Sequence, residues 1–259
     1  MEVAICPDYD TLSKQAAAAV EEIVRAKPDC VIGLATGSSP LGLYAELIRM
    51  HKEEGLDFSK ARSFNLDEYV GLKGDHAQSY RRFMDENLFS GINIDPANTH
   101  VPSGTADDYA RFCADYEKAI ADAGGIDVQV LGIGSDGHIG FNEPGTSLAS
   151  RTHVTTLTEQ TIEDNARFFD NQDEVPRYAC TMGVGTVMEA RRCVLVANGA
   201  KKVPAVSAMI EGPVTAMCTA SALQMHNDTQ VFLDEEAAGG LKLADFYRWT
   251  QKNKANAPK

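Results

Sequence analysis

The chain has 259 residues, of which 44% are hydrophobic and 24% are charged, and its formal net charge is −13 at pH 7. This length and composition can build the core of one α/β domain or of two small ones. The negative charge argues against binding of nucleic acid, which requires a basic patch of useful size. No window of the sequence approaches the roughly 20 apolar residues of a membrane-spanning helix, so we expect no membrane association.

The cysteines indicate the compartment. Six are scattered along the chain, with no C-x-x-C pair and no pairing with histidine at metal-site spacing. Several lie in apolar runs, which is typical of reduced thiols in a protein core. Residues 1–7 lack the basic and apolar regions of a signal peptide. We therefore expect a cytoplasmic protein without a metal site.

In the first half of the chain, helical periodicity alternates with short apolar runs. These patterns predict helices over residues 11–25, 41–51, 79–89 and 105–123. They predict strands over residues 30–34 and 62–66, and a loop over residues 91–101.

The second half continues this alternation around one polar segment. Strands are predicted over residues 128–133, 179–182, 193–197 and 230–233. Helices are predicted over residues 184–189, from after residue 202 to about residue 210, and after residue 240, with a polar, frayed end at 252–259. Residues 150–177 are polar and offer few side chains to a core, so we expect a mobile lid at about 150–180.

The order of these elements predicts the fold. Strands that alternate with helices favour one α/β domain over residues 1–259, with an open, mainly parallel sheet and helices on both faces, similar to a Rossmann fold. Such a sheet collects its functional site from several strand ends. We therefore expect the loops at 36–39, 67, 136–143 and 202 to converge.

A glycine-rich turn after the predicted strand at 128–133 carries Asp136, His138 and Glu143. Three titratable side chains at the end of a buried strand are where an α/β protein would place its chemistry. A polar loop with a chance cluster of charges is the alternative interpretation.

The same turn matches the dinucleotide-binding pattern G-x-G-x-x-G at residues 132–137. That site needs a helix that begins at the third glycine, whose N–H groups bind the pyrophosphate. Here Gly140 and Pro144 follow too soon for a long helix, and Asp136 would repel a diphosphate. We therefore expect no nicotinamide cofactor.

A second turn, at Thr36, Gly37, Ser38 and Ser39, joins the strand at 30–34 to the helix at 41–51. Ser39 is a suitable N-cap and Pro40 suits the first helical position. Unpaired N–H groups at such a helix start favour an anion. The turn lacks G-K-[ST], so it is no Walker loop, and an ordinary capped βα turn explains it equally well.

Asp67 and Glu68 follow the predicted strand at 62–66. A carboxylate there is placed for the cleft at the carboxyl edge of a parallel sheet. A helix cap or a solvated acid is the alternative for one such residue taken alone.

Together these segments resemble the glucosamine-6-phosphate deaminase family over nearly the whole chain. The matching stretches are G-L-A-T-G-S-S-P at 33–40, F-N-L-D-E-Y-V-G-L at 64–72, L-G-I-G-S-D-G-H-I-G-F-N-E-P at 131–144, S-L-A-S-R-T at 147–152, N-A-R-F-F at 165–169 and T-M-G-V-G-T at 181–186. The resemblance implies conversion of glucosamine 6-phosphate to fructose 6-phosphate and ammonia, with no required metal or cofactor.

The resemblance also implies catalytic roles. Asp67 is similar to the base that removes the C2 proton, and His138, oriented by Asp136 and Glu143, is similar to the group that opens the sugar ring. An imidazole with its ordinary pKa of roughly 6.5 can move a proton in either direction near neutral pH. On extended chain, residues 136 and 138 point the same way, so Asp136 can hold the ring tautomer.

The same resemblance implies a phosphate site and a lid, because the polar segment at about 150–180 is similar to the lid of the family. The turn at 36–39, with Arg167 and Lys202, is similar to the family's phosphate site, whereas Lys201 is expected to be a surface cation. Ser38 stands where many members have a second glycine, a change that binding by backbone N–H groups should tolerate.

Some bacterial members are hexamers activated by N-acetylglucosamine 6-phosphate through basic residues shortly after S-R-T, where this chain has His153 and Thr155. We therefore expect a monomer or small homo-oligomer without this activation. Two other functions stay open: a 6-phosphogluconolactonase-like hydrolase and a non-catalytic sugar-phosphate sensor.

Overall fold

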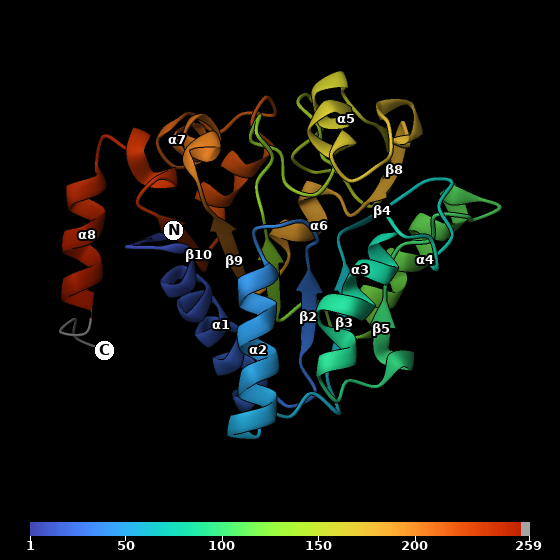
Figure 1. The fold of residues 1–259 in the computed structure, drawn as a ribbon, viewed down its shortest axis with the longest axis horizontal. Helices are drawn as coiled ribbons and strands as arrows, with labels where there is room; N and C mark the ends of the chain where they lie inside the picture. Colours follow the sequence, from blue (N-terminus) through green and yellow to red (C-terminus); the bar gives the residue numbers. More distant parts are fainter. Residues whose placement is uncertain (255–259) are drawn as a thin grey trace.

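The computed structural model describes residues 1–254, so residues 255–259, most of the segment expected to fray, lie outside the described residues. Seven parallel strands form the main sheet (Figure 1). In spatial order they are β1 (Glu2–Cys6), β10 (Thr229–Asp234), β9 (Arg192–Ala197), β6 (Val128–Leu131), β2 (Val31–Leu34), β3 (Arg62–Asn65) and β5 (Thr99–His100). The predicted parallel sheet is confirmed.

Helices cover both faces of this sheet. Within residues 1–254 the helices are α1 (Tyr9–Ala26), α2 (Leu41–Glu54), α3 (Tyr80–Asn87), α4 (Tyr109–Asp122), α5 (Glu159–Ala166), α6 (Val184–Met188), α7 (Val203–Glu211) and α8 (Ala244–Asn253), of which α5 lies beyond the strand ends and not on a face. Two separate apolar cores result, one that contains α1 and α2 and one that contains α4, α6 and α7. Within residues 1–254, no helix has both the length and the apolar character needed to cross a membrane.

A second, antiparallel sheet corrects one expectation. It contains β4 (Asp67–Tyr69), β8 (Tyr178–Thr181) and β7 (His153–Thr156). The strand predicted at 179–182 therefore exists, but it belongs to this sheet and not to the main one. Residues 179–181 are fully buried, and a short apolar run does not distinguish a parallel from an antiparallel neighbour.

The outer elements differ in smaller ways. The apolar pattern does not predict β1 or β5, because both strands lie at the edges of the sheet and are only partly buried, and β5 has only two residues. The expected N-cap of α2 at Ser39 is wrong by one position. Pro40 occupies the cap, and the Ser39 hydroxyl instead donates to Oδ1 of Asn198 at 3.1 Å.

Four adjacent strands of the main sheet position the functional loops. β9, β6, β2 and β3 lie side by side and are parallel, so their carboxyl ends share one edge. Beyond that edge lie the loops that begin after residues 197, 131, 34 and 65. Helix α5 and strand β8 lie above these strand ends (Figure 1). The expected convergence is therefore confirmed.

Candidate active site

A cavity of about 720 Å³ opens at this edge of the sheet. The predicted site residues that line it are Thr36, Gly37, Ser38, Ser39, Asp67, His138, Arg167 and Lys202. Asp136 and Glu143 do not line the cavity. Both instead contact the Nδ1 atom of His138, which does line it. The fold thus brings together side chains separated by more than a hundred residues in the sequence.

The turn between β2 and α2 forms one wall of the cavity. Gly37 has a φ angle of +93°, a conformation that side-chain-bearing residues rarely adopt. Before the turn, the buried hydroxyl of Tyr44 donates to the carbonyl oxygen of Ala35 at 2.5 Å. After it, Ser39 is bound to Asn198 in the loop that follows β9. The turn is therefore fixed at both ends.

Among residues 1–254, three Lys and Arg side chains line the cavity. Lys202 is half-buried, its Nζ atom donates to the carbonyl oxygen of Ile133 at 2.6 Å, and burial lowers its pKa. Arg167 is exposed and lies over the ring of Phe168, 4.7 Å from the ring centre. Lys201 is exposed as expected, but it also contributes to the cavity wall.

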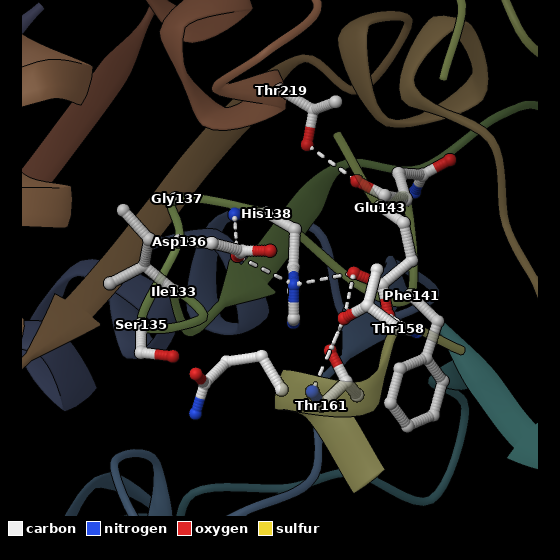
Figure 2. Close-up of polar contacts among 12 residues, drawn as sticks. Ile133, Ser135, Asp136, Gly137, His138, Phe141, Glu143, Thr158, Thr161 and Thr219 are labelled. Carbon is white, nitrogen blue, oxygen red and sulfur yellow. Dashed lines mark hydrogen bonds and ion pairs between the residues drawn. The ribbon is translucent and has the colours of Figure 1, made fainter. Parts of the chain in front are cut away.

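His138 lies in a tight turn with both of its predicted partners (Figure 2). Its Nδ1 atom is 2.8 Å from Oδ1 of Asp136 and 3.5 Å from Oε2 of Glu143. Oδ1 of Asp136 also accepts the backbone N–H of His138 at 3.1 Å. Gly137 has a φ angle of +91°, so the chain is turned here and not extended. The predicted contact is confirmed, but the expected extended backbone is wrong.

The electrostatics of this cluster differ from expectation. Burial opposes a charge on the imidazole, yet the hydrogen bonds and charges of Asp136 and Glu143 outweigh it and raise the pKa of His138 to about 9. Burial also opposes charge on the two carboxyls, and His138 nevertheless lowers the pKa of each. The ring is therefore an imidazolium at neutral pH, not an imidazole with an ordinary pKa.

Glu143 joins this cluster to the first turn of α5. Its Oε1 atom accepts the backbone N–H of Thr158 at 3.1 Å, and its Oε2 atom accepts the Thr158 hydroxyl at 3.3 Å. Thr158 is the N-cap of α5. A second contact joins the same helix to the glycine-rich loop, because the hydroxyl of Ser135 donates to Oδ2 of Asp164 at 2.5 Å.

Asp67 begins β4 and is only 6% exposed. The backbone of Gly140 approaches it closely, since a Cβ atom at that position would lie 3.4 Å from Oδ2 of Asp67. Burial, and then the charge of Glu68, raise the pKa of Asp67 to about 7, although His138 opposes this change. A carboxyl group with a pKa near 7 can both accept and return a proton at physiological pH.

Glu68 is buried beside this carboxyl and binds the start of α3. It accepts hydrogen bonds from the backbone N–H groups of Tyr69, Tyr80 and Arg81 at 2.9–3.1 Å and from the Ser79 hydroxyl at 2.7 Å. This arrangement holds the ring of Tyr80 in the cavity wall. Ser79 is the N-cap of α3, and Glu68 is neither a cap residue nor a solvated acid but a buried acceptor for the N–H groups of the same first turn.

The sequence patterns did not indicate several residues that line the cavity, among them Tyr80, Ser135, Phe141, Asp164 and Asn198. Tyr80 matches an apolar helix position, so its spacing indicates only a core role. Asn198 follows β9 directly, and its position at a strand end was the available signal.

Asp136, His138 and Glu143 also form a candidate metal-ligand set, with ligand atoms within 4.8 Å of one another. A metal ion at this place would need a deprotonated Nδ1 atom. The two carboxylates instead favour a proton on the ring, so a metal ion would have to compete with that proton.

The chain matches the profile of the family described as glucosamine-6-phosphate isomerases/6-phosphogluconolactonase over residues 9–232. It is 54% identical to a glucosamine-6-phosphate deaminase of Arthrobacter sp. (strain FB24), over 98% of each chain. It is 52% identical to a glucosamine-6-phosphate deaminase of Clostridium perfringens (strain 13 / Type A), over 93% of this chain and 100% of that protein.

Solved structures agree with this fold. A structure described as a monomeric glucosamine-6-phosphate deaminase superposes with a TM-score of 0.91 and 45% identity, over 93% of this chain and 100% of that one. The 6-phosphogluconolactonase of Trypanosoma brucei superposes with a TM-score of 0.75 at 22% identity, over 93% of this chain and 98% of that one. The second match shows a shared fold alone.

Proposed function

This chain belongs to the glucosamine-6-phosphate isomerase/6-phosphogluconolactonase family, and we propose that it converts glucosamine 6-phosphate to fructose 6-phosphate and ammonia. The observation that carries this proposal is the shared cavity of Asp67 and His138. It supplies a carboxyl base and a proton-carrying imidazole for one small ligand. The 54% identity to a deaminase over almost the full length favours this activity over others in the family.

The substrate phosphate binds at the turn of residues 36–39. Backbone N–H groups at a helix start favour an anion, and Lys202 and Arg167 add positive charge on the same cavity. The protein as a whole is strongly acidic, so this local concentration of positive charge is what would retain a dianion. The bound phosphate then serves as a remote handle that orients the sugar.

Ring opening is assigned to His138. The Nδ1 atom contacts Asp136 and Glu143, so Nε2 is the ring nitrogen that contacts the sugar. The imidazolium donates its Nε2 proton to the ring oxygen as the C1–O5 bond breaks, and the neutral Nε2 then takes the proton of the anomeric hydroxyl, which restores the imidazolium. The product is the open-chain amino aldehyde, and both carboxylates hold the imidazole in place for the transfer.

Isomerisation is assigned to Asp67. In its ionised form the carboxylate removes the proton from C2 of the amino aldehyde and returns it to C1, while a proton passes from the amino group to O1. The amino aldehyde thereby becomes the imine of the ketose. Water adds to that imine, and the C–N bond breaks to release ammonia and fructose 6-phosphate. These steps need neither a metal nor a cofactor.

Residues 150–180 form the proposed lid. Helix α5 covers the cavity, and hydrogen bonds from Thr158 to Glu143 and from Ser135 to Asp164 join it to the site. Its Ile162 also packs against the small apolar cluster that contains Tyr69 and Phe141. Opening for substrate entry would break these hydrogen bonds and separate this small cluster. The single domain expected over residues 1–259 stays part of this proposal.

Two assays test the activity against the alternatives. Purified protein should release ammonia from glucosamine 6-phosphate and should not hydrolyse 6-phosphogluconolactone. Lactone hydrolysis without ammonia release would favour the hydrolase. Binding of the amino-sugar phosphate without turnover would favour a sensor.

We further propose that the chain acts as a monomer or small homo-oligomer in the cytoplasm. The similar deaminase structure is described as monomeric. All six cysteines are buried free thiols, which suits a reducing compartment. Light scattering of the purified protein measures the oligomeric state directly.

A further inference from the structure

The hydroxyl of Tyr9 lies behind the turn at residues 36–39. Tyr9 is the first residue of α1, and its hydroxyl is 3.1 Å from the carbonyl oxygen of Ser38 and 2.9 Å from that of Ser39. The same hydroxyl accepts the backbone N–H of Gly42 at 2.8 Å. Tyr9 does not line the cavity, whereas Ser38 and Ser39 do.

The packing around Gly42 shows that this contact is built into the fold. A Cβ atom at Gly42 would lie 2.3 Å from the Ser13 hydroxyl oxygen and 3.0 Å from the Cε1 atom of the Tyr9 ring. Any side chain at position 42 would therefore displace α1 or its side chains. The absence of a side chain at this position lets the phenol reach the start of α2.

Peptide geometry converts this contact into an orientation of N–H groups. In a planar trans peptide, the carbonyl of one residue points opposite to the N–H of the next. Because the Ser38 carbonyl points toward Tyr9, the Ser39 N–H points away from Tyr9, on the cavity side of the turn. The Ser39 carbonyl precedes Pro40, which has no N–H, so turning that carbonyl outward removes a negative dipole from the cavity.

We propose that Tyr9 is a positioning residue for anion binding: its hydroxyl holds the Ser38 and Ser39 carbonyls on the outer side of the turn, so that the turn presents N–H groups to a phosphate. The proposal rests on the proposed phosphate site at residues 36–39. Tyr9 touches neither the substrate nor the reacting atoms. Its effect is on how strongly the phosphate binds, not on the proton transfers.

The test is Tyr9→Phe, which removes the hydroxyl and keeps the ring, with Tyr247→Phe on α8 as the matched control. Tyr247 is partly buried and lies outside the cavity. For each variant and the wild type, KM and kcat for glucosamine 6-phosphate, the Ki of inorganic phosphate as a competitive inhibitor, and Tm are measured.

Tyr9→Phe should raise KM and the phosphate Ki by the same factor, about three- to tenfold, because the contacts of the hydroxyl with the Ser38 and Ser39 carbonyls, which orient the turn, are lost. Its kcat should stay within about twofold of wild type, and Tyr247→Phe should change neither KM nor Ki. A lower Tm with unchanged KM and Ki would overturn the inference, since Tyr9 would then only join α1 to α2. If inorganic phosphate did not compete in the wild type, the phosphate site itself would be wrong.

Discussion

The imidazole of His138 and the carboxylate of Asp136 face each other across one tight turn, with Nδ1 2.8 Å from Oδ1. Glu143 approaches the same nitrogen at 3.5 Å. The hydrogen bonds and the negative charges of these two carboxylates outweigh the burial of the ring and keep it protonated. The site therefore holds an imidazolium at His138 and a carboxyl group with a raised pKa at Asp67, which are the proposed acid and the proposed base.

These two pKa values set a bell-shaped pH profile. Because the base must be ionised, kcat/KM should rise as the pH increases through about 7, where Asp67 loses its proton. It should fall above about 9, where His138 loses its proton. Steady-state kinetics from pH 5 to about 10.5 measure both limbs. A profile that is flat from pH 6 to about 8 would contradict the raised pKa of Asp67.

Asp67→Asn separates catalysis from stability. Without its base the enzyme should lose roughly 10²–10⁴-fold in kcat. Because folding raises the pKa of Asp67, this carboxyl group stabilises the folded wild-type protein below the ordinary pKa of 3.8. That contribution to the free energy of unfolding is lost as the pH rises to about 7. At pH 8 the variant should therefore be more stable than wild type, by roughly 1–4 kcal/mol in urea unfolding. Asp107→Asn, at an exposed position, is the control and should change neither quantity.

His138→Gln tests the ring-opening role. Glutamine cannot carry the transferred proton, so turnover of the cyclic substrate should fall by about 10²-fold or more. An open-chain analogue bypasses this step and should recover part of the rate. The exposed His76 offers a control substitution to glutamine. An equal loss of rate with cyclic and open-chain compounds would place His138 in a later step.

The two neighbouring lysines form a matched pair. Lys202 is half-buried and bound to the Ile133 carbonyl, whereas Lys201 is exposed. Lys202→Met should raise KM by roughly 10- to 100-fold, because a charge-assisted contact to the phosphate is lost in a partly desolvated place. Lys201→Met should raise KM by less than about threefold. Equal effects of the two substitutions would show that only the overall charge matters.

N-acetylglucosamine 6-phosphate should leave the substrate saturation curve unchanged. The segment after S-R-T carries His153 and Thr155 on β7. The nearby Arg151 is already paired with Glu117 and Glu189, at 2.6 Å each. No unpaired cation is therefore evident there for an anionic effector, among the side chains from 151 to 156. A leftward shift of the curve on addition of the compound would disprove this.

The sequence predicts the site better than it predicts the site's surroundings. Strand ends can be located from apolar runs and glycine-rich turns, and parallel strands place their ends together, so the convergence of Asp67, His138 and Lys202 followed. The pKa of His138 could not be predicted, because it depends on two carboxylates whose distances arise only in the folded turn. The second sheet was missed because β4 has only three residues and β7 has no buried residue, so neither gives an apolar run, and their partner lies about a hundred residues away from β4.

The three-stranded sheet that begins at Asp67 has a consequence for how the enzyme should lose activity on heating. Its own apolar core is small, with Tyr69, Phe141, Leu157 and Ala179 as its buried members. Small cooperative units open before the rest of a protein does. On warming, amide protons of β7 and β8 should exchange with deuterium while the seven-stranded sheet is still protected. Heat inactivation would then precede global melting, and brief cooling would restore turnover.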